Sequence, residues 1–415
     1  FGVKFEGREN FKHLCDALRD LYEITVDEKG EKFLGLSIKW NYLAGWVEIS
    51  MPGYVKKALL RFQHIAKTRR QNAPHSWNKP VYGRKIQLAA TDESPSAPAT
   101  AATHVQQVVG TFLYYGLGID LTMLVTLGTL ASQQTCPTEA TMSEVTWFLD
   151  YCASNPDAVI RYERSEMVLW TVTDASYLSE PRARSRAGAL FFLSDLPKDP
   201  KNPKSTTPKQ NGIIYAMAKI IPNVMSSAME SEVAGTFMAA KEACPIRVAL
   251  EEMGHPQPPT PMQADNSTAV GFANNKIKPK RSKAIDMRFH WVRDRVTQGQ
   301  FVVYWSPGKD NLADYVTKHH PPSHHVNMRP KFFRLKHYAN IVVSYLLQGC
   351  DSSPVSHVRK YVRSTPAQLN YPAVTRLNPP FAHANNTTVK QDSNPYDRSY
   401  NLPVTMPNQI KSLIN

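Results

Sequence analysis

Between about Arg161 and Lys318, segments typical of strands alternate with segments typical of helices, and this alternation leaves few folds open to the chain. Apolar residues fill five short runs, whereas several of the segments between them place apolar residues at helical spacing. The region is therefore predicted to form an α/β domain. In chain order, the strand-like runs are MVLWTVTD, AGALFFLSD, GIIYAMAKII, PTPMQAD and GQFVVYWS.

Lone acids recur at matching places in this alternation. Asp174 ends the first strand-like run and Asp265 ends the fourth, while Glu232 and Asp314 lie in the helices after the third and fifth runs. Strand ends of an α/β sheet converge on one edge, so these carboxylates are expected to meet there. Because like charges repel, four carboxylates need cations to stay ionised together. Mg²⁺ takes oxygen ligands, and two such ions can promote phosphodiester cleavage.

Each of these acids also has a plainer interpretation. Asp174 could be a turn residue, Glu232 a charge on a helix surface, and Asp314 a solvated helix acid. Asp265 could cap the helix that follows it, a role that Asp performs well. The order of the four acids along the elements favours the metal site over four separate roles.

The chain is strongly basic, with 49 Lys and Arg against 35 Asp and Glu and a net charge of +14, which favours an anionic partner such as nucleic acid. A basic run soon after Asp265 is predicted to grip a phosphate backbone, although a solvated loop or a nuclear-localisation run has the same composition. Its residues are Lys276, Lys278, Lys280, Arg281 and Lys283. Three further candidates follow in the next predicted helix, namely Arg288, His290 and Arg293. His290 could equally be a packed helix residue.

Shifts in composition divide the chain into five parts. Residues 1–84 mix strands and helices, residues 85–103 form a linker, and residues 104–160 are helical. Residues 161–320 form the α/β domain, and residues 321–415 are predicted to be largely disordered because Pro, Asn and Ser dominate much of them. Trp305 is expected in the core, and the loop PKDPKNPKSTTPKQN is expected to be a solvent-exposed excursion.

The apolar stretch Val108–Ala131 is long enough to span a membrane, but Asp120 lies in its middle. A central Asp costs about 2.5–3.5 kcal/mol on insertion scales, so a break between two packed helices is the better prediction and no membrane partner is expected. The five cysteines are scattered singly, which argues against a disulfide framework or a zinc site and favours a reducing compartment. A first residue other than Met suggests a fragment or a processed product.

Five segments of the α/β region resemble signatures of the ribonuclease H domain of copia-type retrotransposon Pol polyproteins. The first two resemble the family's Asp followed by a Gly-hydrophobic hairpin, and its Ser-Ser-x-Glu-x-Glu helix. The other three contain Asp-Asn-x-x-Ala, Lys-x-Ile-Asp-x-Arg-x-His and Leu-Ala-Asp-x-x-Thr-Lys. As they stand here, they are TDASYLSEPRARSRAGALFFLS, MSSAMESEVAGTFMAAKEA, ADNSTAVGFANN, KRSKAIDMRFHWVRD and NLADYVTK.

The resemblance implies a ribonuclease H-like fold, an α/β domain with a five-stranded mixed sheet and flanking helices. It reaches upstream, where FGVKFEG, KFLGLSI and SMPGYVKKALLRF resemble the end of the palm and the thumb of a reverse transcriptase. The fold class it implies is therefore this domain preceded by an α+β and helical thumb-and-connection-like region. The polymerase's paired aspartates would lie before Phe1, so this chain alone is not expected to polymerise DNA.

The resemblance also implies an activity, the hydrolysis of the RNA strand of RNA–DNA hybrids with two Mg²⁺ ions, or Mn²⁺ in their place. Asp174, Glu232, Asp265 and Asp314 become the catalytic metal ligands, with Glu230 as second choice to Glu232. Retroviral relatives carry a mobile His before the last acid, where Lys309 and Asp310 stand here. The implied partners are the hybrid and the rest of the Pol polyprotein.

Two other functions agree with parts of the sequence. A non-enzymatic nucleic-acid-binding remnant of a decayed retroelement would keep the fold and the charge without turnover, although all four acids are present. A transposase or integrase on a related fold would use a different order of acids.

Overall fold

The computed structural model describes residues 2, 3, 5, 7–77, 92–276 and 289–334. Its N-terminal part contains a four-stranded antiparallel sheet with the order β1-β2-β3-β4. The last strand comes from beyond the helices that follow β3, because β4 pairs with β3 from Ser50↔Val159 to Trp46↔Glu163. The strands are β1 (Lys32–Phe33), β2 (Leu36–Asn41), β3 (Trp46–Ser50) and β4 (Val159–Glu163).

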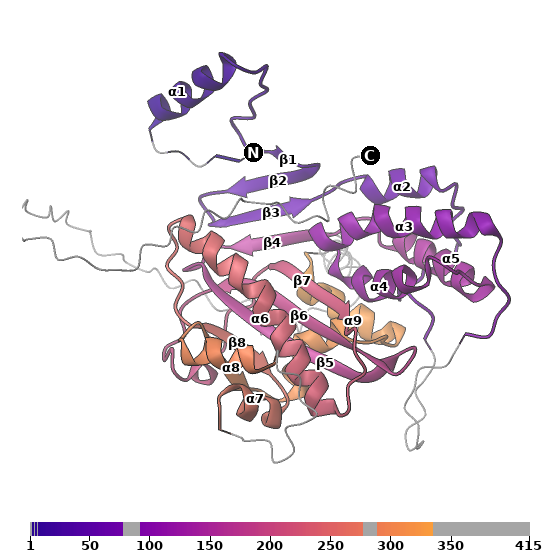
Figure 1. Cartoon of the computed structure of the whole chain (residues 1–415). Helices are drawn as coiled ribbons and strands as arrows, with labels where there is room; N and C mark the ends of the chain where they lie inside the picture. Colours follow the sequence, from indigo (N-terminus) through magenta and orange to yellow (C-terminus); the bar gives the residue numbers. More distant parts are fainter. Residues whose placement is uncertain (1, 4, 6, 78–91, 277–288, 335–415) are drawn as a thin grey trace, which may run out of the picture. The chain divides into compact units, whose positions relative to one another are not determined.

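Along the chain, the helices of this part lie between β3 and β4, except for α1, which precedes β1 (Figure 1). α3 starts at Ala99 and ends at Gly118, and α4 starts at Leu124, so the apolar stretch breaks at Asp120 as predicted. Thr138 caps α5, with its hydroxyl accepting from Thr141 N–H. The helices are α1 (Arg8–Arg19), α2 (Tyr54–Arg61), α3 (Ala99–Gly118), α4 (Leu124–Gln133) and α5 (Glu139–Ser154). No helix in the described ranges has the length and apolarity needed to cross a bilayer.

The second sheet has five strands in the order β7-β6-β5-β8-β9. β5, β6 and β7 pair antiparallel, whereas β8 runs parallel to β5 and to β9. This mixed sheet with its flanking helices confirms the predicted ribonuclease H-like α/β fold, and the α+β and helical region precedes it. The strands are β5 (Val168–Glu180), β6 (Arg184–Ser194), β7 (Ile213–Ile220), β8 (Thr260–Ala264) and β9 (Phe301–Trp305).

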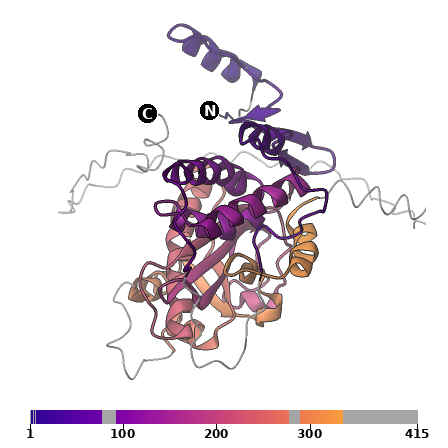
Figure 2. The ribbon, with the colours of Figure 1, turned by 90° about the vertical axis from the view of Figure 1, so that its right-hand side faces the viewer.

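Both faces of the second sheet are covered, because alternate residues of its strands enter two different cores. Leu169 and Phe191 pack with α6, α7 and α8 on one face. Trp170 and Phe192 pack with α3, α4 and α5 on the other, where the turned view of Figure 2 shows these N-terminal helices beside the sheet. The covering helices after the hairpin strands are α6 (Ala228–Glu252), α7 (Ser267–Ala273) and α8 (His290–Thr297).

Two helices contain prolines in their interior. α6 runs on through Pro245 to Glu252, and beyond the proline Arg247 donates to Pro258 O at 2.6 Å and so ties the helix to the start of β8. Residues 321–415 were predicted to be largely disordered, but ordered structure continues past residue 321, because Pro322–Phe332 form α9. Pro322 suits the first turn of a helix, where its missing N–H costs nothing.

α9 is held by polar contacts that the sequence did not reveal. Arg329, 5% exposed, donates to Asp120 Oδ2 at 2.8 Å and to Tyr151 OH at 2.6 Å. The Nε2 atoms of the buried His325 and His75 lie 3.2 Å apart. α9 is therefore part of the core that covers one face of the second sheet.

Candidate functional site: a carboxylate cluster at the sheet edge

Three of the four predicted acids meet at one edge of the second sheet. Asp174, Glu232 and Asp265 each offer a carboxylate oxygen, and these atoms all lie within 4.8 Å of one another. They come from β5, from the first turns of α6 and from the residue after β8. Residues separated by up to 91 positions in the sequence therefore share one site because β5 and β8 run parallel and α6 crosses beside them.

Asp174 lies in the middle of β5, not at its end as predicted from the sequence. The strand continues because the hairpin with β6 extends to Glu180, whereas the parallel pairing with β8 stops at Val172. Asp174 thus stands just past the last parallel pair. Because the strand continues through Asp174, this residue is not a turn residue, and at 5% exposure it is buried.

Glu232 and Glu230 have different surroundings. Glu230 Oε2 accepts a hydrogen bond of 2.7 Å from Ser226 N–H, so this carboxylate supports the start of α6. Glu232 points to the other acids, is 8% exposed, and its Oε2 has no hydrogen-bond partner among the described residues. A buried carboxylate oxygen without a donor is unfavourable, and a bound cation would satisfy it.

Asp265 is not the cap of the following helix. Asn266 takes that role, since its side chain accepts from the N–H groups of Thr268 and Ala269. Gly308 packs closely against the Asp265 carboxylate, because a Cβ at that position would lie 2.7 Å from Oδ2. The Asp265 carboxylate therefore does not cap α7, and the backbone of Gly308 confines it on one side.

Asp314 lies in the short helix η6 (Leu312–Val316) and is outside the group of three. Its carboxylate pairs with the Lys318 ammonium, one turn further on. Asn311 holds η6 against β5, since its side-chain amide donates to Thr173 O at 2.8 Å. Asp314 is near enough to raise the pKa values of both Asp174 and Asp265.

The electrostatics of the cluster fit a cation site. Burial, with the charges of Asp314 and Asp265, raises the pKa of Asp174 to about 6. Burial, with the charges of Asp174 and Asp265, raises the pKa of Glu232 to about 9. Burial and Asp314 also raise the pKa of Asp265. Without a cation the site favours protonated carboxyls, and a divalent ion would relieve the repulsion.

Two neighbours of the acids could not be identified as site residues from sequence patterns. The Thr317 hydroxyl donates to Asp174 Oδ2 at 2.6 Å. Gly188 pairs with Asp174 across the hairpin, and a Cβ there would lie 2.5 Å from Thr317 Cγ2. Glycine at this position lets η6 approach β6 closely enough for Thr317 to reach Asp174. The only signal in the sequence was the Thr of the Leu-Ala-Asp-x-x-Thr-Lys segment.

The predicted nucleic-acid-binding residues are described only in part. Lys276 is exposed and follows α7, whereas Lys278, Lys280, Arg281, Lys283 and Arg288 lie outside the described residues. In α8, Arg293 lies 3.3 Å from His290 Nδ1, and both side chains contact the Phe272 ring. His290 and Arg293 are thus half-buried against α7, and in the described part of the chain neither forms a hydrogen bond or ion pair with an acid of the cluster.

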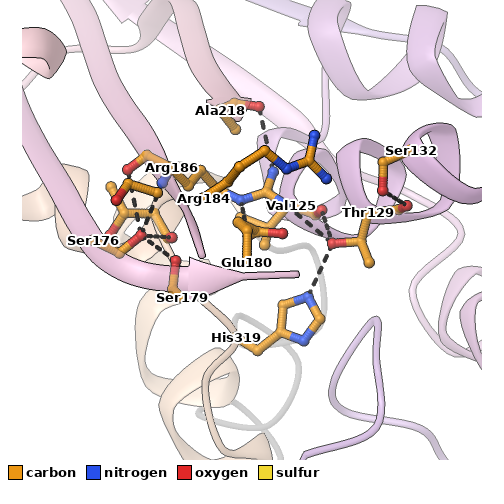
Figure 3. A network of polar contacts seen from close by, with 12 residues as sticks. Val125, Thr129, Ser132, Ser176, Ser179, Glu180, Arg184, Arg186, Ala218 and His319 are labelled. Carbon is orange, nitrogen blue, oxygen red and sulfur yellow. Dashed lines mark hydrogen bonds and ion pairs between the residues drawn. The ribbon is translucent and has the colours of Figure 1, made fainter. Parts of the chain in front are cut away.

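Arg186, on the hairpin after Asp174, is a structural residue. It is fully buried, and its guanidinium donates to Glu180 Oε1 at 2.7 Å and to Thr129 Oγ1 at 3.1 Å (Figure 3). Gly128 permits this approach, because a Cβ there would lie 2.6 Å from Arg186 Nη1. This network holds the hairpin of β5 and β6 against α4, and β5 is the strand that carries Asp174.

No family model matches the chain. The retrovirus-related Pol polyprotein from transposon TNT 1-94 of Nicotiana tabacum is 26% identical over 175 residues, which cover 42% of this chain and 12% of that polyprotein. The transposon Ty1-MR1 Gag-Pol polyprotein of Saccharomyces cerevisiae is 20% identical over 325 residues, covering 74% of this chain and 17% of that polyprotein. The match thus spans less than a fifth of the length of either relative.

Solved structures of reverse transcriptases and ribonucleases H are among those that resemble the chain. The foamy viral protease-reverse transcriptase in complex with RNA/DNA hybrid has a TM-score of 0.40 and 12% identity, with coverage of 74% of this chain and 34% of that one. The compost metagenome LC11-RNase H1 has a TM-score of 0.27 and 14% identity, with coverage of 36% of this chain and 91% of that one. At such TM-scores the fold assignment rests on the strand order itself.

Proposed function

Since the chain is a relative of copia-type retrotransposon Pol polyproteins and contains a ribonuclease H-like domain, we propose that this domain hydrolyses the RNA strand of RNA–DNA hybrids during reverse transcription. The observation that carries the proposal is the meeting of Asp174, Glu232 and Asp265, with one buried Glu232 oxygen that lacks a partner. Among the described residues, Lys318 is a base whose charge acts on all three acids, and one base does not account for three acids that face one another.

In this proposal Asp174, Glu232, Asp265 and Asp314 hold two Mg²⁺ ions, or Mn²⁺ in their place. Bound ions would supply an activated water and stabilise the leaving oxygen of the phosphodiester. Thr317 fixes the orientation of the Asp174 carboxylate by its hydrogen bond, as outer partners of metal ligands commonly do. Asn311 holds η6, and with it Asp314, against the strand that carries Asp174.

The substrate assignment is supported by charge and by the partial exposure of one acid of the cluster. A net charge of +14 suits a polyanion, and Asp265 is partly exposed, whereas Asp174 and Glu232 are buried. A hybrid would be recognised mainly by its shape, its backbone and its 2′-hydroxyl groups. Lys276, His290 and Arg293, with the basic residues outside the described ranges, are the proposed backbone contacts.

The test is cleavage of a hybrid whose RNA strand carries a 5′ label, with the same RNA single-stranded and in an RNA duplex for comparison. The wild-type chain should cut only the hybrid, and only with Mg²⁺ or Mn²⁺. Asp174→Asn should lower the rate at least about a hundredfold, since loss of even an outer partner of a metal ligand costs about 10–100-fold.

Asp294→Asn is the matched control, because Asp294 is an exposed acid of α8 whose contact is with Gln298. It should cleave at the wild-type rate. Equal cleavage by Asp174→Asn and the wild type would refute the assignment. Hybrid binding without cleavage under either metal would favour the non-enzymatic binding protein instead.

A further inference from the structure

Trp305, at the end of β9, was expected in the core but is 38% exposed. Its indole N–H donates to the backbone oxygen of Asp265 at 2.7 Å. The register of the sheet also pairs Trp305 with Ala264, the residue before Asp265. A large aromatic ring is therefore held at the surface by the same residue that contributes a carboxylate to the cluster.

The loop between β6 and β7 reaches this ring, although the sequence suggested a solvent-exposed excursion. Pro203 is buried, and the short helix η2 (Pro203–Ser205) packs against β9. The next residue, Lys204, is exposed and places its ammonium 4.8 Å from the centre of the Trp305 ring. No acid in the described part of the chain forms an ion pair with Lys204.

The pair has the chemistry of a contact for a sugar–phosphate backbone. An unpaired ammonium attracts a phosphate, and an exposed indole offers a flat surface to a sugar or a base. A cation over an aromatic ring at an exposed site contributes about 0.5–1 kcal/mol. That contribution does not explain why more than a third of the indole remains in water beside the acids.

We propose that Trp305 and Lys204 form a contact for the sugar–phosphate backbone of the nucleic acid next to Asp265. The inference rests on the proposed function and deepens it, since it assigns two further residues to the substrate surface. The loop that carries Lys204 is therefore part of the substrate surface. It lies against β9, which flanks the acids.

Binding can be measured separately from cleavage. Fluorescence anisotropy of a labelled RNA–DNA hybrid of about 20 base pairs, in EDTA and over a series of salt concentrations, gives the affinity and its salt dependence. Lys204→Ala in the full chain should weaken binding about fivefold and reduce the salt slope by about one. Lys201→Ala, an exposed lysine of the same loop, is the matched control and should change each value little.

Trp305 is tested through its own spectroscopic signal. Trp305→Ala should weaken binding about tenfold, and Trp305→Phe should lose less because it keeps an aromatic ring. Binding of the hybrid should change the tryptophan fluorescence of the wild type, and that part of the change should be missing in Trp305→Phe. Circular dichroism of each variant reports whether the fold is intact, and Trp305→Phe keeps the test valid if Trp305→Ala unfolds.

Two results would overturn the inference. One is an equal effect of Lys204→Ala and Lys201→Ala on affinity and salt slope, which would indicate diffuse attraction only. The other is an unchanged affinity in Trp305→Phe together with an unchanged fluorescence response. Either result leaves hybrid cleavage intact, whereas cleavage by Asp174→Asn at the wild-type rate would remove the proposed function itself.

Discussion

At the scale of single residues, the hydrogen bond of the Thr317 hydroxyl to Asp174 can be tested by one substitution. The hydroxyl donates to Asp174 Oδ2 at 2.6 Å, and Asp174 lies in the carboxylate cluster. Thr317→Val removes the hydroxyl with little change in volume. We expect Mg²⁺ affinity and hybrid cleavage to fall about 10–100-fold, the effect typical of outer partners of metal ligands.

Isothermal titration with Mg²⁺ measures the first effect without any substrate. Thr297→Val is the control, because the Thr297 hydroxyl donates to Arg293 O on α8. Wild-type Mg²⁺ affinity in Thr317→Val would contradict a positioning role for this hydroxyl.

A second prediction concerns pH and the metal-free protein. The pKa of Glu232 is about 9 in the folded protein against an ordinary value of 4.5, so its charged form is disfavoured by folding. Stability in EDTA should therefore fall as the pH rises from 7.5 to 9. Above pH 7.5 the buried His75 and His325, whose pKa values burial lowers, are neutral in both the folded and the unfolded chain and add no opposing change. Mg²⁺ should raise the Tm more at pH 8.5 than at pH 6.5.

Thermal melts of the wild type and Glu232→Gln check this expectation. Without a charge to lose or gain, Glu232→Gln should melt higher than the wild type in EDTA at pH 8.5 and respond weakly to Mg²⁺. A lower Tm for Glu232→Gln under those conditions would show that the carboxylate stabilises the fold by another contact.

The candidate ligands could be chosen from the sequence because each is a lone acid tied to one element of the alternation. What the sequence left open was which oxygens face one another. Only the structure separates Glu232 from Glu230, which bonds to Ser226, and assigns the helix cap to Asn266 and not to Asp265. The role of Thr317 could not be predicted from the sequence, since it depends on how closely η6 packs on Gly188.

At the scale of elements, the five strands of the second sheet were predictable because their apolar runs are short and bounded by turn residues. α9 was not, because Pro321, Pro322 and Pro330 suggest a break. It is held by tertiary contacts, among them the buried pair of Arg329 with Asp120 and the packing of Met328 and Phe332 in the core. Local sequence cannot report a partner 209 residues away.

Removing one partner of this buried pair should destabilise the protein strongly. Arg329→Met leaves Asp120 buried and uncompensated, so we expect a loss of about 3–5 kcal/mol in the free energy of unfolding. Denaturant unfolding measures it. Arg334→Met, which breaks an exposed pair with Glu48, is the control and should cost at most about 1 kcal/mol. Similar losses in both variants would contradict the burial of Arg329.

At the scale of the whole molecule, the excess of basic residues predicts how hybrid binding depends on salt. Each phosphate that a Lys or Arg neutralises releases counterions, so the logarithm of the affinity should fall linearly with the logarithm of the salt concentration. If Lys204, Lys276 and the basic run each neutralise phosphates, the plot of log affinity against log salt concentration should have a slope of about −4 or steeper in anisotropy titrations. A slope near zero would mean that the charge of +14 serves another partner.

The pairing of Asp120 with Arg329 also bears on synthesis at the ribosome. A nascent chain that has emerged only as far as α5 exposes Asp120 and Tyr151 without the guanidinium that satisfies them in the finished molecule. Such an intermediate would hold a costly unpaired carboxylate, so docking of its first helices should stay incomplete until α9 leaves the exit tunnel. Premature termination before Arg329 should therefore yield a protease-sensitive product, even though every candidate metal ligand has already been translated.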